Sequence, residues 1–317
     1  MPAPRVAAIL IGRNEGPRLL AALEALPPDV SPVIYVDSGS TDGSVDAALA
    51  RGARVVSLDM TRPFTAARAR NEGYAALAPD RPDYIQFIDG DCALVPGWIE
   101  TATAFLDAHP AAAVACGRRR ERFPEASVWN RLCDAEWDTP VGRASACGGD
   151  ALMRSAAFAA VGGYTPGLIA GEEPELCVRL RAAGWEIWRL DAEMTLHDAA
   201  MTRFSQWWKR TRRAGHAFAE GAAIHGRPPE RHFVTETRRA VIWGAALPGA
   251  ALLGALISPL ALLLLLLYPV QILRLAPRMG LTRATFLTLG KLPEAAGVAE
   301  YWFGRLSGRR ARLIEYK

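Results

Sequence analysis

The chain has 317 residues, of which 50% are hydrophobic and 22% charged, and its formal net charge at pH 7 is +4. This length allows one large domain or two smaller ones, and the apolar content excludes extensive disorder. Five cysteines are scattered without a CxxC pair, which indicates neither a zinc site nor a disulfide framework and suits a reducing cytosol. No secretory signal is predicted, because the first residues lack a charged start and a long apolar core.

Short apolar strands alternate with helices through the first part of the chain. Strands are predicted at 6–11, 33–36, 54–58 and 84–88, and helices at 16–26, 64–77, 97–109 and from the capping residues 40–43 to 51. Further on, helices are predicted at 155–161, 172–183 and 204–220, with a strand at 185–190. This alternation favours an α/β fold with a parallel sheet covered by helices on both faces.

Polar side chains follow three of the predicted strands. Ligands bind beyond the carboxyl ends of strands in parallel sheets, so these side chains are the first candidates for a binding site. They are Asn14, Glu15, Asp37, Ser38, Asp89 and Asp91. The periodicity alone therefore predicts that acidic groups converge on one crevice.

The segment Ile88-Asp89-Gly90-Asp91 places two carboxylates on either side of a glycine, directly after an apolar strand. Gly90 lets the backbone turn sharply, so that both carboxylates can face one ligand. Hard oxygen ligands of this kind suit Mg²⁺ or Mn²⁺ bridging a diphosphate. A turn or a solvated loop tip is the alternative, and the preceding strand favours the metal site.

Four segments, AAILIGRNE, VDSGSTDGS, ARARNEG and IQFIDGDC, resemble in order and spacing the inverting family 2 glycosyltransferases of GT-A fold, a Rossmann-like fold. The resemblance covers roughly residues 5–220. It implies that Asp37 reads the nucleobase and that Glu15 lies in the same pocket. It also implies that Asp89 lies near the ribose, as a donor and metal contact, and that Asp91 ligates the metal. Residues expected to flank the nucleotide, with a solvated helix face as the alternative, are Arg68, Arg70 and Asn71.

Glu172-Glu173 stands where family members usually carry Glu-Asp, whose second acid is the general base. The resemblance gives this role to Glu173, and its longer side chain leaves Glu172 as an alternative. A positioned carboxylate helps a hydroxyl to attack by taking its proton in the transition state. Acids also stabilise a helix N-terminus, and both roles can hold at once.

Two later residues complete the predicted site. His197, in Thr195-Leu196-His197-Asp198, follows a predicted strand and fits the late histidine that completes the metal shell in many GT-A enzymes, with a purely structural histidine as the alternative. Gly148-Gly149-Asp150 resembles the donor-sugar loop of the family, so Asp150 is expected to touch the sugar or the acceptor.

The segment Gln206-Trp207-Trp208-Lys209-Arg210 departs in order from the QxxRW signature of processive family members, so processive synthesis is not expected. The two tryptophans fit either an acceptor platform or a membrane interface.

Residues 240–273 are strongly apolar and have arginines on both sides. One straight helix of this length would run roughly 50 Å, longer than the ~30 Å hydrocarbon core. Pro248, Pro259 and Pro269 also disfavour it. A single span would leave a basic tail outside the cytosol, against the positive-inside tendency. This tail contains Arg305, Arg309, Arg310 and Arg312. A helical hairpin that turns near Ser258-Pro259 is therefore predicted, re-entrant or spanning, with a buried apolar pair in a soluble protein as the alternative.

The predicted organisation is a GT-A domain over 1–225, a linker and membrane hairpin over 226–280, and a basic amphipathic tail over 281–317. The predicted function is an inverting, Mn²⁺- or Mg²⁺-dependent glycosyltransferase at the cytosolic face of a bacterial inner membrane. Its expected partners are a UDP- or GDP-linked sugar donor and a lipid-linked or saccharide acceptor in exopolysaccharide assembly, with no nucleic acid. A polyprenyl-phosphate sugar synthase and a non-catalytic nucleotide-sugar-binding scaffold are the alternatives.

Overall fold

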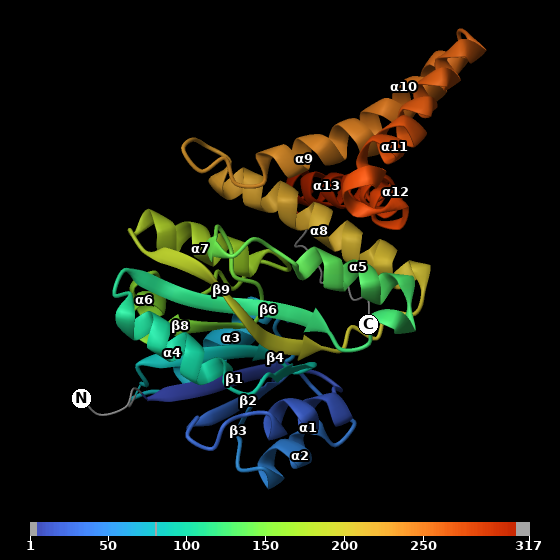
Figure 1. Cartoon of the computed structure of the whole chain (residues 1–317). Helices are drawn as coiled ribbons and strands as arrows, with labels where there is room; N and C mark the ends of the chain where they lie inside the picture. The colour runs from blue at the N-terminus through green and yellow to red at the C-terminus, as the bar shows by residue number, and fades with distance from the viewer. Residues whose placement is uncertain (1–4, 80, 309–317) are drawn as a thin grey trace. The chain divides into compact units, whose positions relative to one another are not determined.

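The computed structural model describes residues 5–79 and 81–308, and the chain divides into two compact units, Met1–Thr202 and Arg203–Lys317 (Figure 1). The predicted boundary at residue 225 lies later than this division, because the helix Phe204–His225 belongs to the second unit.

The first unit contains these elements in order: β1 (Val6–Gly12), α1 (Pro17–Glu24), β2 (Val33–Asp37), α2 (Ser44–Ala50), β3 (Arg54–Ser57), α3 (Ala66–Ala75), β4 (Tyr84–Asp89), β5 (Cys92–Leu94), α4 (Trp98–Ala108), β6 (Ala112–Glu121), η1 (Pro124–Ala126), α5 (Val128–Trp137), β7 (Gly142–Arg143), β8 (Ala151–Arg154), α6 (Ser155–Ala160), α7 (Glu172–Ala182) and β9 (Glu186–His197). The second contains α8 (Phe204–His225), α9 (Val234–Val241), η2 (Ile242–Ala246), α10 (Leu247–Ala255), η3 (Pro259–Leu266), α11 (Leu267–Met279), α12 (Leu281–Leu289) and α13 (Lys291–Leu306).

The first unit is built on a nine-stranded sheet of order β3-β2-β1-β4-β8-β6-β9-β5, with β7 paired to β9. The strands β3, β2, β1 and β4 are parallel, as the alternation of strands and helices predicts. The rest of the sheet is mixed, because β8 runs antiparallel to both β4 and β6, and β5 runs antiparallel to β9. Mixed sheets of this kind are common among large α/β folds.

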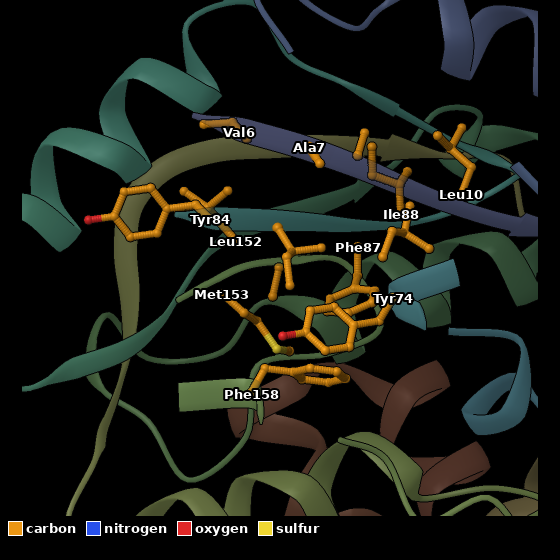
Figure 2. Close-up of a cluster of buried hydrophobic side chains, with 14 of the residues drawn as sticks. Val6, Ala7, Leu10, Tyr74, Tyr84, Phe87, Ile88, Leu152, Met153 and Phe158 are labelled. Carbon is orange, nitrogen blue, oxygen red and sulfur yellow. The ribbon is translucent and has the colours of Figure 1, made fainter. Parts of the chain in front are cut away.

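Helices cover both faces of the parallel part of this sheet. In the view of Figure 1, α1 and α2 lie together on one side of β1 and β2, and α3 lies on the other side. Figure 2 shows Tyr74 of α3, Phe87 of β4 and Phe158 of α6 gathered in the core, with ring centroids of Tyr74 and Phe158 4.8 Å apart. Each such buried aromatic ring contributes roughly 1.5–3 kcal/mol. This packing fixes the strands whose ends carry the predicted site.

The second unit is held together by a close crossing of α8 and α13. A Cβ added to Gly215 would lie 2.0 Å from the carbonyl oxygen of Glu294, and one added to Gly297 would lie 2.0 Å from that of Arg212. Only glycine allows the two backbones to approach this closely. The segment predicted as a tail therefore forms α12 and α13 within this unit, and Arg309, Arg310 and Arg312 lie outside the described residues.

The apolar segment folds as a helical hairpin at the predicted position. The first arm runs through α9, η2 and α10, and the chain turns at Ser258, whose extended backbone (φ −148°, ψ 125°) is the conformation favoured before Pro259. The second arm returns through η3 and α11 beside the first (Figure 1). The Tyr268 hydroxyl donates a hydrogen bond to the Trp243 carbonyl, and the two rings lie 5.9 Å apart. The π-helical turn η2 lies just before Pro248, a position where an α-helix would be strained.

The hairpin exposes its apolar side chains. Leu256 and Ile257 at the turn are 84% and 92% exposed. The second arm, Pro259–Met279, has 21 residues with a mean hydropathy of 1.9 and none of its most apolar window buried, so it could cross a membrane by length and composition. The rest of the described chain does not cover this surface, unlike the buried helical pair considered as an alternative.

Candidate active site

The carboxyl ends of β2, β1 and β4 lie level with one another. Gly12 pairs with Asp37, and Ile11 pairs with Asp89, so the residues after these strands meet at one edge of the sheet as predicted. Asn14 joins the first two loops: its N–H donates to the Ser40 hydroxyl at 2.9 Å, and its side-chain oxygen accepts the Thr41 N–H at 2.8 Å.

Glu15 lies against the turn between the two aspartates. A Cβ added to Gly90 would meet the Ile11 carbonyl oxygen at 3.0 Å and the Glu15 side chain at 3.1 Å. The glycine of the Asp89-Gly90-Asp91 turn is therefore required by a close backbone approach. Glu15 also pairs with Arg18 at 2.8 Å.

Asp37 holds its own turn together. Its carboxylate accepts the N–H groups of Gly39 and Ser40 at 2.9 and 3.0 Å and the Tyr35 hydroxyl at 3.2 Å. Burial raises the pKa of Tyr35, so this hydroxyl is a stable donor. The Ser38 hydroxyl is buried without a hydrogen-bond partner among the described residues, which is the kind of group that a ligand satisfies.

Arg68 and Asn71 hold loops through backbone contacts. Arg68, which is 5% exposed, donates to the carbonyl oxygens of Asp59 at 2.9 Å and Pro63 at 3.1 Å. The Asn71 side chain donates to the Tyr164 carbonyl at 2.7 Å and accepts its N–H at 2.9 Å. Arg68 is therefore not on a solvated helix face, and in this structure both residues shape the surroundings of the site.

Arg70 connects the two halves of the predicted site. Its guanidinium is 2.8 Å from Glu172 and 2.7 Å from Asp89, and the residue is 2% exposed. The other Asp89 oxygen pairs with Arg119 at 2.9 Å. Burial works to raise the pKa of Asp89, but Arg70 and Arg119 hold it well below its usual range. The strand-end aspartates and the glutamate pair thus belong to one charged network.

Asp150 is the buried support of this network. It has no exposed surface, and it accepts the backbone N–H of Asp89 at 2.9 Å and the Thr195 hydroxyl at 2.9 Å. Its carboxylate also lies 3.3 Å from Arg119, whose guanidinium lies over the Trp137 ring. In this structure Asp150 positions Asp89 and Arg119, and its contact with the sugar or the acceptor stays a prediction.

Asp91, His197 and Glu121 form a second group of contacting side chains. His197 is the last residue of β9, whereas the sequence predicts that it follows a strand. Its Nε2 is 3.3 Å from Asp91, and its Nδ1 is 3.3 Å from Glu121. Glu121 also accepts N–H groups from Phe123 and Ala199. Burial lowers the pKa of His197, and the charge of Arg119 lowers it further.

These residues fit a divalent cation. The Glu121 carboxylate accepts a hydrogen bond, so Nδ1 of His197 carries the proton and the Nε2 lone pair faces the Asp91 carboxylate. Two acceptors at this distance repel each other unless a cation lies between them, and an imidazole oriented by a carboxylate is a common metal ligand. The ligand atoms of Asp91, Cys92 and His197 all lie within 4.8 Å of one another. Asp89, also predicted as a ligand, has both oxygens paired with arginines.

The two predicted bases face different neighbours. Both lie in the first turn of α7, after Gly171, whose φ of 77° places it in the left-handed region. Glu172 pairs with Arg70, whereas Glu173 accepts the Cys147 N–H and lies 3.2 Å from the Cys177 thiol.

Arg119 and Glu121 were not predicted from the sequence. Both lie near the end of β6, where an apolar run, residues 112–116, is followed by charged residues. Residues two apart in a strand share a face, so the pattern Arg119-x-Glu121 after an apolar run is the signal that could have indicated them.

Comparison with known proteins identifies a domain in the first unit. Residues 8–158 match the model of glycosyl transferase family 2. The chain is 29% identical over 194 residues to the succinoglycan biosynthesis protein ExoA of Rhizobium meliloti, and this match covers 56% of the chain and 58% of that relative. The matched region thus spans little more than half of the relative's length.

Solved structures show the same fold. The mannosyltransferase PcManGT from Pyrobaculum calidifontis, in complex with GDP-Man and Mn²⁺, has a TM-score of 0.68 at 20% identity, over 95% of this chain and 88% of that one. Glucosyl-3-phosphoglycerate synthase from Mycobacterium tuberculosis, in complex with Mn²⁺ and UDP-glucose, has a TM-score of 0.52 at 18% identity, over 71% and 80%. The chain therefore contains a glycosyltransferase family 2 domain with the Rossmann-like GT-A fold, as its motifs predict.

Proposed function

We propose that the chain is an inverting, metal-dependent glycosyltransferase that moves a sugar from a UDP- or GDP-linked donor to a hydroxyl of a lipid-linked acceptor in exopolysaccharide assembly. The observation that carries this proposal is the Arg70 bridge between Asp89 and Glu172. It brings the strand-end aspartates and the glutamate pair to one site, which a transferase needs and a passive nucleotide-sugar scaffold does not. The ExoA relative supports the exopolysaccharide role.

Asp91 and His197 would hold the divalent cation. When bound, such an ion neutralises charge that develops on a departing nucleoside diphosphate. Glu121 orients His197 for this role, and Arg70 and Arg119 keep Asp89 ionised beside it. Mn²⁺ complexes among the structural neighbours support the choice of a divalent cation.

Glu173 is the proposed general base. A carboxylate paired with an arginine is a weaker base than one whose partners are neutral. Glu172 is paired with Arg70, whereas an amide N–H and a thiol contact Glu173. Glu173 takes the proton of the acceptor hydroxyl as its oxygen attacks the anomeric carbon, and the diphosphate leaves from the opposite face. Glu172 positions Arg70.

We place the enzyme at the cytoplasmic face of the inner membrane, with the hairpin inserted from that side. Exposed leucines along both arms support insertion, since a large exposed apolar surface is unusual in a soluble monomer. Arginines at the open end, including Arg239 and Arg274, suit the cytoplasmic side.

Transfer of labelled sugar to a bacterial lipid extract tests this function. Full-length protein in detergent is given UDP- and GDP-sugars, and the Glu173→Gln variant is compared with Glu100→Gln, a change at an exposed site on α4. We expect transfer from one donor, lowered at least about a hundredfold in Glu173→Gln with donor binding retained. Label on no lipid or saccharide, from any donor, would contradict the proposal.

A further inference from the structure

The second unit contains a cavity of about 450 Å³ that the catalytic site does not use. Four helical segments line it with polar side chains, one of which is Thr288 of α12. Arg239 and Trp243 come from the first arm of the hairpin, Gln271, Arg274 and Arg278 come from α11, and Lys291 begins α13. Small-ligand sites have roughly this size, about 300–1,000 Å³.

Three of the four cationic side chains that line this cavity have no carboxylate partner among the described residues. Within residues 5–79 and 81–308, no carboxylate forms an ion pair with Arg239, Arg274 or Arg278, whereas Lys291 pairs with Glu294 at 2.6 Å. Arg274 and Arg278 are one helical turn apart, so their guanidinium groups share a face of α11. Like charges repel unless an anion lies among them, and guanidinium groups are suited to phosphate oxygens.

The position of the cavity restricts the kind of anion. Arg239 and Trp243 stand where the first apolar arm begins, and Gln271, Arg274 and Arg278 stand where the second arm ends. Between them the chain exposes leucines along both arms as far as the turn at Leu256 and Ile257. A ligand that satisfies this whole surface has an anionic head in the cavity and apolar chains along the arms.

We propose that this cavity binds the phosphate headgroup of an anionic membrane phospholipid and thereby fixes the depth of the hairpin. The inference rests on the membrane attachment proposed above. Basic pockets at the cytoplasmic side of membrane helices bind such headgroups. A zwitterionic lipid presents a cationic group that the three arginines repel, and a soluble phosphate ester leaves the apolar arms uncovered. Trp243 and Tyr268 place aromatic rings at the same end of the arms, as expected at a membrane interface.

Calorimetric titration of the detergent-solubilised full chain tests the site without donor or metal. The probes are short-chain phosphatidylglycerol, phosphatidylcholine with the same acyl chains, and glycerol 1-phosphate, which lacks acyl chains. We expect phosphatidylglycerol to bind at least about tenfold more tightly than either other probe, because each charged hydrogen bond contributes strongly. The Arg274→Gln/Arg278→Gln double variant should lose at least about tenfold in this affinity.

The matched control is Arg238→Gln/Arg283→Gln, which removes two exposed arginines of the same unit outside the cavity lining. It should keep phosphatidylglycerol binding within about twofold. An equal loss of phosphatidylglycerol affinity in both double variants would contradict a specific site and indicate binding by diffuse surface charge. Equal binding of glycerol 1-phosphate would overturn the lipid assignment. Flotation with pure phosphatidylcholine vesicles tests membrane attachment separately from headgroup binding. It reports insertion of the hairpin and does not require the cavity.

Discussion

At the scale of single residues, the site is organised by side chains that position others. The strand-end acids can be predicted from their place in the sequence, because apolar strands with acids at their ends mark one edge of a sheet. The glutamate pair is indicated only by the family resemblance. Their partners cannot be predicted in this way. Arg70 contacts Glu172 across 102 positions of sequence, and only the folded chain brings them together. Glu121 is separated from His197 by 76 positions and carries no motif of its own.

Glu121→Gln should weaken metal binding. Its carboxylate fixes the His197 tautomer, and loss of such an orienting partner costs about 10–100-fold in metal affinity. Mn²⁺ titration followed by electron paramagnetic resonance measures this directly. Glu125→Gln, at an exposed side chain close by on η1, is the control and should bind Mn²⁺ normally. Unchanged Mn²⁺ affinity in Glu121→Gln would show that His197 is not a ligand oriented by Glu121.

Arg70→Gln should destabilise the first unit as well as impair transfer. The change leaves Asp89 and Glu172 without a shared cation in a site where Arg70 is 2% exposed. Removing one partner of a buried pair costs about 3 kcal/mol, which lowers the Tm by at least about 5 °C in a domain of this size. Thermal unfolding followed by tryptophan fluorescence measures it. Arg120→Gln, which breaks an exposed pair with Glu193, should change the Tm by less than about 2 °C.

At the scale of elements, sequence periodicity identifies β1 to β4 and α1 to α4 but misses β6 and α5, although each of these has ten residues. β1, β2, β3 and β4 lie within a residue or two of their predicted ranges, because each is built around apolar, largely β-branched or aromatic residues. β5, β7 and β8 have only two to four residues each, and they pair through contacts set by the rest of the sheet. β9 continues to His197, well past its predicted end, because Asp191 and Glu193 interrupt its apolar run without ending the strand.

In α8, Glu220 should make the stability of the second unit depend on pH. Burial raises the pKa of Glu220 to about 7. Its nearest titratable neighbour is His216, at 3.7 Å, whose pKa burial lowers and Glu300 raises. Between the ordinary pKa of a glutamate and pH 7, the folded chain holds a proton that the unfolded chain has released. The contribution of Glu220 to stability therefore falls as the pH rises through this window.

Glu220→Gln removes this titration while leaving His216 in place. The difference in free energy of unfolding, variant minus wild type, should be more positive at pH 8 than at pH 5. Chemical denaturation of both proteins at both pH values measures it. Glu230→Gln, at an exposed position in the same unit, should show no such difference. A constant difference between Glu220→Gln and wild type across this range would contradict the raised pKa.

At the scale of the whole molecule, the chain combines a GT-A unit with a helical unit that carries an exposed apolar hairpin. The hairpin can be predicted because Pro259 disfavours the α conformation at Ser258 and thereby sets the turn. The packing of α12 and α13 into the helical unit cannot, since it depends on the glycine crossing of α8 and α13.

The hairpin should be the membrane anchor. Leu256→Glu/Ile257→Glu places two carboxylates at the tip, and charged groups in the hydrocarbon region are costly. Flotation with phosphatidylcholine vesicles should show at least about a tenfold loss of binding. Leu49→Glu changes an exposed leucine of α2 and should float like the wild type. Equal flotation of all three proteins would exclude the hairpin as the anchor.

The most direct test of the central claim is release of nucleoside diphosphate from the accepted donor with Mn²⁺, with EDTA, and with EDTA followed by excess Mn²⁺. The account predicts release that EDTA abolishes and Mn²⁺ restores, and a loss of at least about a hundredfold in Asp91→Asn. Glu100→Gln should match the wild type. Release that is insensitive to EDTA, or an Asp91→Asn variant as active as the wild type, would contradict a metal-dependent transferase centred on Asp91 and His197.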